Sequence, residues 1–195
     1  MKAAWEGKDK LCKLFLKEKT VQIVESSLIV EEKDPGGAGS IKIQISGDAL
    51  QFGPSETAVK WLASNECADG AFLEFSENGL SLHIIELKSK LDTKKWEKAK
   101  SQFRGMFLRA TAICSVLGIG ELKNVTCYIA YCEDAITPHL KSNPILLKRT
   151  LGDGGLTSKY DDWTKRTVNI TDAVVANVVD VVRDNAGNST LDLAA

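Results

Sequence analysis

The chain has 195 residues, of which 44% are hydrophobic and 26% charged, and its formal net charge is −1. This length suits a single domain over residues 1–195, and the composition is typical of a globular protein. The balanced charge excludes a globally basic nucleic-acid binder. No apolar run approaches the roughly 20 residues that span a bilayer, and the N-terminus lacks the apolar core of a signal peptide. We therefore expect a cytoplasmic protein with no membrane partner.

The first elements are predicted to be a helix and a hairpin. Residues 4–18 have the apolar spacing of an amphipathic helix. Residues 21–32 are rich in β-branched side chains, and residues 41–46 alternate between isoleucine and polar side chains. A turn rich in proline and glycine at 34–39 separates them, so we expect an antiparallel pair that extends the N-terminal side of the core.

A second hairpin is predicted in the centre of the chain. Ser55 can cap a short helix over residues 56–64. Strands over 69–76 and 80–89 follow, joined by Asn78-Gly79, which is the strongest short hairpin signal.

A long helix is predicted over residues 93–117, where one apolar stripe persists until Gly118. The apolar strand expected over 125–131 lacks alternation, as in a strand buried on both faces. These elements, with the central hairpin, define an expected core at about residues 55–135.

The C-terminal third carries weaker patterns. They predict a helix over 141–147, a strand over 167–170 and a helix over 173–183, followed by a frayed tail over 185–195.

The cysteines indicate a reducing compartment. Their number is odd and no two form a C-x-x-C pair, so we expect free thiols rather than disulfides or a zinc site. The five are Cys12, Cys67, Cys114, Cys127 and Cys132.

Glu86 and Lys88 are two charged residues at the end of a predicted strand whose earlier part is apolar. Being two residues apart, they point to one face of the sheet, whereas His83 and Leu87 point to the other. His83 is therefore expected to be structural.

The turn places an acid beside this pair. If Asn78-Gly79 forms a two-residue loop, Asp69 lies opposite Lys88 and Ala71 lies opposite Glu86. Asp69, Glu86 and Lys88 then share one face, with a small residue between them. Two carboxylates are ligands that Mg²⁺ prefers, and the lysine could stabilise charge that builds on a phosphate. The alternative is a salt-bridge cluster at the edge of the sheet.

The following helix adds polar groups near the strand end. Lys98 and Gln102 are four residues apart and share a helix face, so Gln102 could hold a phosphate or a water. The stretch from Lys88 to Arg109 contains eight basic residues, these two included, and only two acids, Asp92 and Glu97. This stretch is either a phosphate-facing surface or a solvated helix face.

The order of these motifs resembles the PD-(D/E)xK nuclease superfamily. The resemblance covers about a fifth of the chain and rests on Ala68-Asp69-Gly70-Ala71-Phe72, Asn78-Gly79, Ile84-Ile85-Glu86-Leu87-Lys88-Ser89, Lys98 and Gln102. It implies a restriction-endonuclease-like α/β/α fold, with a mixed central sheet flanked by helices. It also implies Asp69, Glu86 and the Leu87 carbonyl as metal ligands, Lys88 as the catalytic lysine and Gln102 as an active-site residue.

Some family features are absent or ambiguous. Ala68 stands where the family often has proline, and Met106 stands where the RecB-like branch has tyrosine. The upstream helix glutamate could be Glu18, Glu25 or Glu56.

The resemblance implies a DNA endonuclease that uses Mg²⁺, with Mn²⁺ able to substitute, in restriction, phage defence or repair. Nucleic acid is the expected partner, with DNA favoured over RNA, and a homodimer or larger assembly is plausible by analogy. Two alternatives stay open. One is a non-catalytic nucleic-acid-binding or protein-interaction domain on the same fold. The other is an unrelated α/β interaction domain, in which Glu86 and Lys88 would be exposed and far from Asp69.

Overall fold

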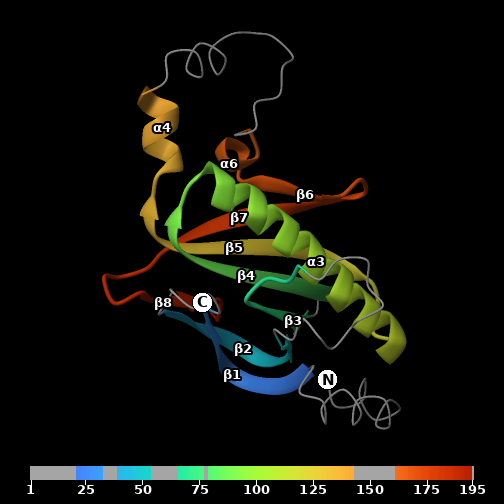
Figure 1. The fold of residues 1–195 in the computed structure, drawn as a ribbon. Coiled ribbons are helices and arrows are strands. Elements are labelled where there is room, and N and C mark those ends of the chain that lie inside the picture. Colours follow the sequence, from blue (N-terminus) through green and yellow to red (C-terminus); the bar gives the residue numbers. More distant parts are fainter. Residues whose placement is uncertain (1–20, 33–38, 54–65, 77–78, 143–160, 195) are drawn as a thin grey trace.

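The computed structural model describes residues 21–32, 39–53, 66–76, 79–142 and 161–194. Its elements, labelled in Figure 1, are β1 (Val21–Glu31), β2 (Ser40–Phe52), β3 (Gly70–Ser76), β4 (Gly79–Leu91), α3 (Thr93–Leu117), β5 (Leu122–Asp134), α4 (Ile136–Ser142), α6 (Asp161–Lys165), β6 (Thr167–Thr171), β7 (Val174–Val182) and β8 (Asn188–Asp192). The helices expected over 4–18 and 56–64 lie outside the described residues.

The strands form one mixed sheet in the order β1-β2-β3-β4-β5-β7-β6, with β8 added beside β2. β4, β5 and β7 run parallel to one another, and β1 to β4 form antiparallel pairs. Both predicted hairpins, β1–β2 and β3–β4, are therefore confirmed, as is the mixed α/β class.

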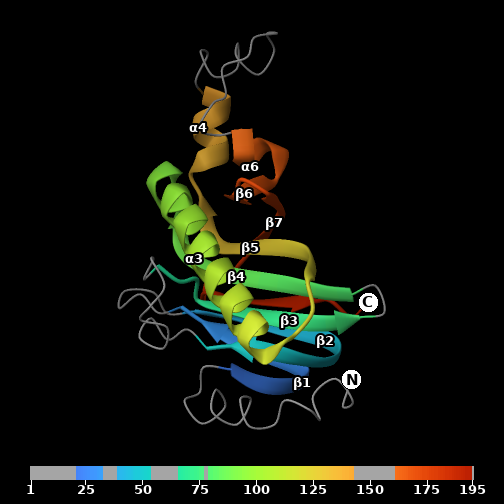
Figure 2. The same cartoon turned by 90° about the vertical axis from the view of Figure 1, so that its right-hand side faces the viewer.

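Helix α3 lies across one face of the sheet (Figures 1 and 2) and has the predicted bounds. The Asp92 side chain caps its N-terminus by accepting a hydrogen bond from the Lys95 N–H, and Gly118 ends it in the left-handed conformation, at φ 59°. Its buried stripe includes Trp96, Phe103 and Met106, and this stripe packs on the sheet. No helix of the described residues has the length and apolar character needed to cross a membrane.

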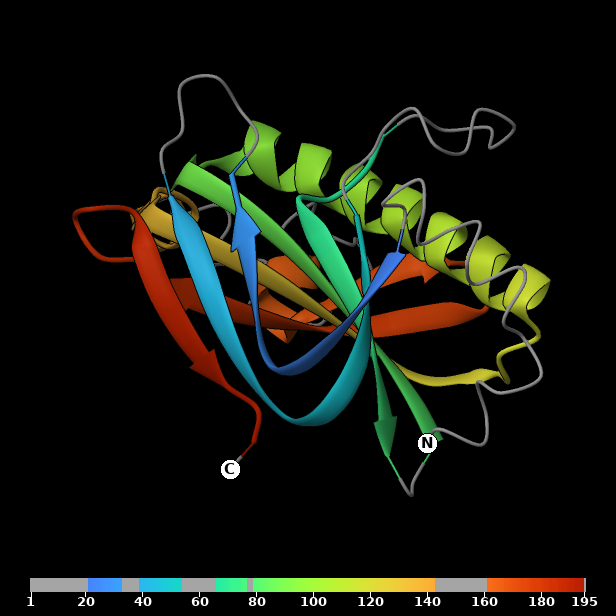
Figure 3. The same ribbon diagram turned by 90° about the horizontal axis from the view of Figure 1, so that it is seen from below.

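Strand β4 separates two apolar clusters because its side chains alternate between the faces. Leu82 and Ile84 join the cluster under α3, whereas Ile85 and Leu87 join a second cluster on the opposite face. Within the described residues, this second cluster is built from the strands and the C-terminal Leu193, with no helix contributing. β1 and β2 bend strongly along their length (Figure 3), which helps the strands enclose the second cluster.

The register of the central hairpin differs from the prediction. Gly70 pairs with Ile85 and Ala71 with Ile84, so Ala71 is not opposite Glu86 as expected. Ser76 pairs with Gly79, which has a φ of 113° and closes the hairpin one residue earlier than predicted. Moving the loop by one position moves every pairing by two, and each side chain therefore keeps its face.

The C-terminal third corrects two predictions. Residues 173–183 were expected to be helical, but Val174–Val182 forms strand β7. Its valines are stiff at χ1 and favour a strand over a helix, and β5 provides a parallel partner. The tail expected to fray instead forms β8, which pairs in parallel with β2. The strand predicted at 167–170 is confirmed as β6, and α4 overlaps the start of the helix expected over 141–147, most of which lies outside the described residues.

Candidate active site

Asp69, Glu86 and Lys88 lie together on the face of the sheet that α3 covers. Their exposed fractions are 7%, 0% and 4%. β4 positions Glu86 and Lys88 through its alternation, and Asp69 immediately precedes β3, its neighbour. Charged side chains are almost never this buried unless they are paired. The arrangement excludes the interpretation in which Glu86 and Lys88 are exposed and remote from Asp69.

Hydrogen bonds join the three residues into one cluster. The Asp69 backbone N–H donates to Glu86 Oε2 at 3.1 Å, and the Leu87 N–H donates to Asp69 Oδ2 at 2.8 Å. The Lys88 ammonium forms an ion pair with Glu86 Oε1. Continuing the pairing of β3 and β4 places Asp69 opposite Glu86, rather than opposite Lys88 as predicted.

The Leu87 carbonyl belongs to the same group of oxygens. Within a strand, the N–H and C=O of one residue point to the same side. Because the Leu87 N–H points at Asp69, its carbonyl also faces the end of β3. The carboxylates of Asp69 and Glu86 and the carbonyl of Leu87 therefore lie where the segment before β3 meets β4.

The charge of the cluster is unbalanced. Burial, and then the nearby Asp69 carboxylate, raise the pKa of Glu86 to about 7, despite the opposing effects of Lys88 and of the Asp69 N–H. With all three groups ionised, two negative charges face one positive charge, which leaves a net charge of −1. A cation bound beside the two carboxylates would compensate this charge.

Gln102 lies beside the segment that leads into Asp69. Its Nε2 donates to the carbonyl oxygen of Cys67 at 3.4 Å, and its Oε1 is buried without a hydrogen-bond partner among the described residues. The backbone of Glu66 passes so close to α3 that a Cβ on Gly105 would lie 1.9 Å from the Glu66 oxygen. This contact fixes Gln102 relative to the chain that carries Asp69.

The donor set is smaller than that of a self-sufficient metal site. The described residues contain no group of three or more His, Cys, Asp or Glu side chains that could hold a metal. Of the three residues considered as the upstream acid, Glu25 is exposed on β1, which two strands separate from β4 in the sheet, and Glu18 and Glu56 lie outside the described residues. A cation at this site would use Asp69, Glu86 and the Leu87 carbonyl, with water and substrate completing its shell, as Mg²⁺ sites commonly do.

The sequence reasoning missed a polar group on the neighbouring strand. Tyr131 is the register partner of Lys88, and its hydroxyl donates to Asp180 on β7 at 2.9 Å. Asp180 also forms a 3.3 Å ion pair with Arg166, whose guanidinium lies 4.2 Å from the ring centroid of Trp163. A parallel β-α-β pattern in the sequence could have indicated that the ends of these strands meet.

His83 lies on the opposite face, as expected. It stacks on Phe72 with ring centroids 4.6 Å apart, and its Nδ1 lies 3.0 Å from the Tyr128 hydroxyl. Burial lowers the pKa of His83 to about 4, so the ring is neutral at physiological pH. This environment supports a structural role. The free thiols expected at Cys67, Cys114, Cys127 and Cys132 are confirmed, whereas Cys12 lies outside the described residues.

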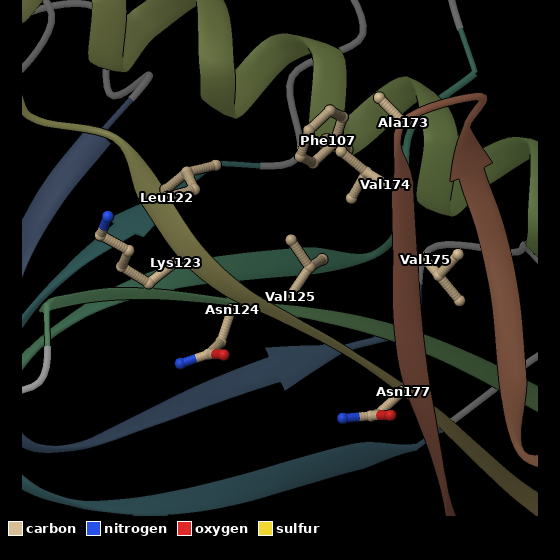
Figure 4. Close-up of a pocket in the computed structure, with 9 residues that line it drawn as sticks. All are labelled: Phe107, Leu122, Lys123, Asn124, Val125, Ala173, Val174, Val175 and Asn177. Atoms are coloured by element: carbon tan, nitrogen blue, oxygen red, sulfur yellow. The ribbon is translucent and has the colours of Figure 1, made fainter.

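A cavity of about 320 Å³ lies where β5 and β7 begin, far along β5 from the site. Figure 4 shows Asn124 and Asn177 on the opposite side of these strands from Phe107, so its lining does not converge on one point. It is separate from the Asp69–Glu86–Lys88 cluster.

Comparisons with profiles of known families, with curated protein sequences and with solved structures give no match for this chain.

Proposed function

We propose that the chain is a metal-dependent nuclease of the PD-(D/E)xK type, with a restriction-endonuclease-like core formed by β2 to β5 and α3. The observation that carries the proposal is the buried cluster of Asp69, Glu86 and Lys88 near the carboxyl end of β4. In open α/β sheets, ligands bind at the carboxyl ends of the strands. DNA is the preferred substrate in this proposal.

The oxygen atoms at the site fit Mg²⁺ or Mn²⁺. Asp69, Glu86 and the Leu87 carbonyl would hold the cation, and the net charge of −1 that the cluster carries when Glu86 is ionised favours its binding. A bound divalent cation polarises a phosphoryl oxygen and lowers the pKa of water.

The other side chains would act directly on the substrate. The ammonium of Lys88 can donate hydrogen bonds to the phosphate and stabilise negative charge there as the bond to the leaving oxygen breaks. The buried Oε1 of Gln102 can accept a hydrogen bond from the attacking water and orient it. Burial excludes bulk water from both interactions and strengthens them.

The test is cleavage of plasmid, single-stranded DNA and RNA with Mg²⁺, with Mn²⁺ or with EDTA. Wild type is compared with Glu86→Gln and Lys88→Ala. Lys90→Ala is the matched control, because Lys90 follows on the same strand but forms an exposed ion pair with Glu133. We expect losses of about 100-fold or more for the first two variants, by analogy with the removal of one charge-stabilising group, and wild-type activity for the control.

Cleavage that persists in EDTA, or in Lys88→Ala, would overturn the mechanism. Absence of cleavage by folded wild type on all three substrates would favour the alternative of a non-catalytic domain, in which the ion pair of Lys88 with Glu86 is purely structural.

A further inference from the structure

The cations of α3 differ in whether they are neutralised. Lys100 is neutralised by Glu97 and Asp162, which it contacts at 3.0 Å each. Arg109 has no carboxylate partner among the described residues either, but it is buried and cannot meet a ligand at the surface. In the described part of the chain, the four remaining cations have no carboxylate partner within ion-pair distance. These are Lys94, Lys95, Lys98 and Arg104.

Three of these four lie on one side of the helix. At about 100° per residue, Lys94, Lys95 and Lys98 fall within an arc of about 100° that also contains Gln102. We call these three residues the lysine flank. Arg104 lies outside this arc, about 120° around the helix from Lys98 and about 180° from Lys95.

The lysine flank borders the candidate site. Gln102, within the same arc, contacts the carbonyl of Cys67, two residues before Asp69. Lys94 and Lys98 are exposed and Lys95 is half-buried. The flank therefore presents three positive charges beside the segment that carries Asp69.

Three cations on the other side of the site are neutralised, whereas Lys165 of α6 is exposed and has no carboxylate partner among the described residues. Lys100 is paired with Asp162 of α6, Lys90 with Glu133 and Arg166 with Asp180. A polyanion that approaches the site consequently meets three uncompensated positive charges along the lysine flank but only that of Lys165 on the α6 side, within the described surface near the site.

We infer that the lysine flank binds the sugar–phosphate backbone of a nucleic-acid strand beside the bond to be cleaved. This inference rests on the proposed function and adds the path of the substrate, which runs along α3 over residues 66–69 rather than over α6. Each lysine that contacts a phosphate releases counterions, so binding through the flank weakens as salt rises.

The experiment measures binding of labelled single-stranded and duplex DNA, and of RNA, over a range of salt concentrations with Ca²⁺ present. Wild type is compared with Lys95→Gln, Lys98→Gln and the matched control Arg104→Gln. Gln has nearly the helix propensity of Lys and Arg, and thermal melts check that each variant folds. We expect each lysine variant to lower the salt slope by about 0.7 to 0.9 and to weaken binding by about five- to tenfold at moderate salt, whereas the control matches wild type.

The outcomes separate this inference from the nuclease proposal. If Arg104→Gln weakens binding as much as Lys98→Gln, or if neither lysine variant changes the salt slope, the path is wrong even if the protein cleaves DNA. If the lysine variants behave as expected but wild type does not cleave with Mg²⁺, the binding surface stands and the nuclease does not. If wild type binds no nucleic acid, both the lysine-flank inference and the nuclease proposal are wrong.

Discussion

Glu86 is the residue whose chemistry depends most on its surroundings. It is fully buried, it accepts a hydrogen bond from the Asp69 N–H, and it forms an ion pair with Lys88. Burial and the Asp69 charge together raise its pKa from 4.5 to about 7. The carboxyl group is therefore near its midpoint at neutral pH, where a proton and a metal cation would compete for it.

This pKa predicts how stability changes with pH. The folded state keeps the Glu86 proton up to about pH 7, whereas the unfolded state loses it near pH 4.5. The contribution of Glu86 to the free energy of unfolding is present below pH 4.5 and is lost as pH rises toward 7. In wild type, the free energy of unfolding should therefore fall by up to about 1.4 kcal/mol per pH unit across this range because of Glu86. Urea denaturation should show that Glu86→Gln removes this fall.

Glu133→Gln is the control, since Glu133 is exposed on β5 and forms its ion pair at the surface. The free energy of unfolding of Glu133→Gln should change with pH as that of wild type does. An unchanged slope in Glu86→Gln would mean that Glu86 titrates normally in the folded protein.

At the scale of elements, the important contact joins α3 to the segment before β3. Gly105 allows the backbone of Glu66 to pass against the helix, and Gln102 holds the Cys67 carbonyl one turn earlier. The same contact determines where Asp69 enters the site. Helix α3 therefore aligns residues from two parts of the chain as well as covering the sheet.

Gly105→Ala tests this contact. A methyl group there would lie 1.9 Å from a backbone oxygen, so the helix and the segment must move apart. Alanine favours a helix by about 1 kcal/mol over glycine, yet we expect a net loss of several kcal/mol. Thermal unfolding measures the stability, and Mg²⁺-dependent cleavage measures the displacement of Asp69. Gly47→Ala is the control, because no neighbouring atom lies within 4 Å of the added carbon. A Gly105→Ala variant that is stable and fully active would show that the helix does not need this close contact.

At the scale of the whole molecule, the sheet curves until distant strands meet. Glu32 follows β1 and Arg183 follows β7, with four strands between β1 and β7 in the sheet, yet the two residues form a 2.8 Å ion pair with side chains 4% and 1% exposed. Strand β8 completes the approach by pairing with β2 (Figure 3). The pair and β8 together close the second apolar cluster.

Removing one partner of this pair leaves the other charge buried. We expect Arg183→Met to lower the free energy of unfolding by about 3–5 kcal/mol, measured by urea denaturation. The double variant with Glu32→Leu should recover part of that loss, because no buried charge remains. Lys90→Ala is the control, because Lys90 forms an exposed ion pair, and it should change the free energy of unfolding by less than about 1 kcal/mol. An equally small effect of Arg183→Met would mean that the curvature of the sheet does not depend on the pair of Arg183 with Glu32.

The sequence by itself determined the features that depend on neighbouring residues. The bounds of α3 follow from an apolar stripe, the Asp92 cap and Gly118, and the face shared by Glu86 and Lys88 follows from strand alternation. The predicted register of β3 and β4 was incorrect, but a shift of two residues keeps each side chain on its face. Asp69, Glu86 and Lys88 therefore share one face as predicted.

Only the tertiary structure decided the features that depend on distant partners. The valine-rich segment of β7 becomes a strand beside β5, and the C-terminal residues of β8 find β2, about 150 positions away. The burial that raises the pKa of Glu86 comes from α3 and the neighbouring strands together. Local patterns fix periodicity, but pairing, burial and charge balance are set by contacts between residues that no short window contains.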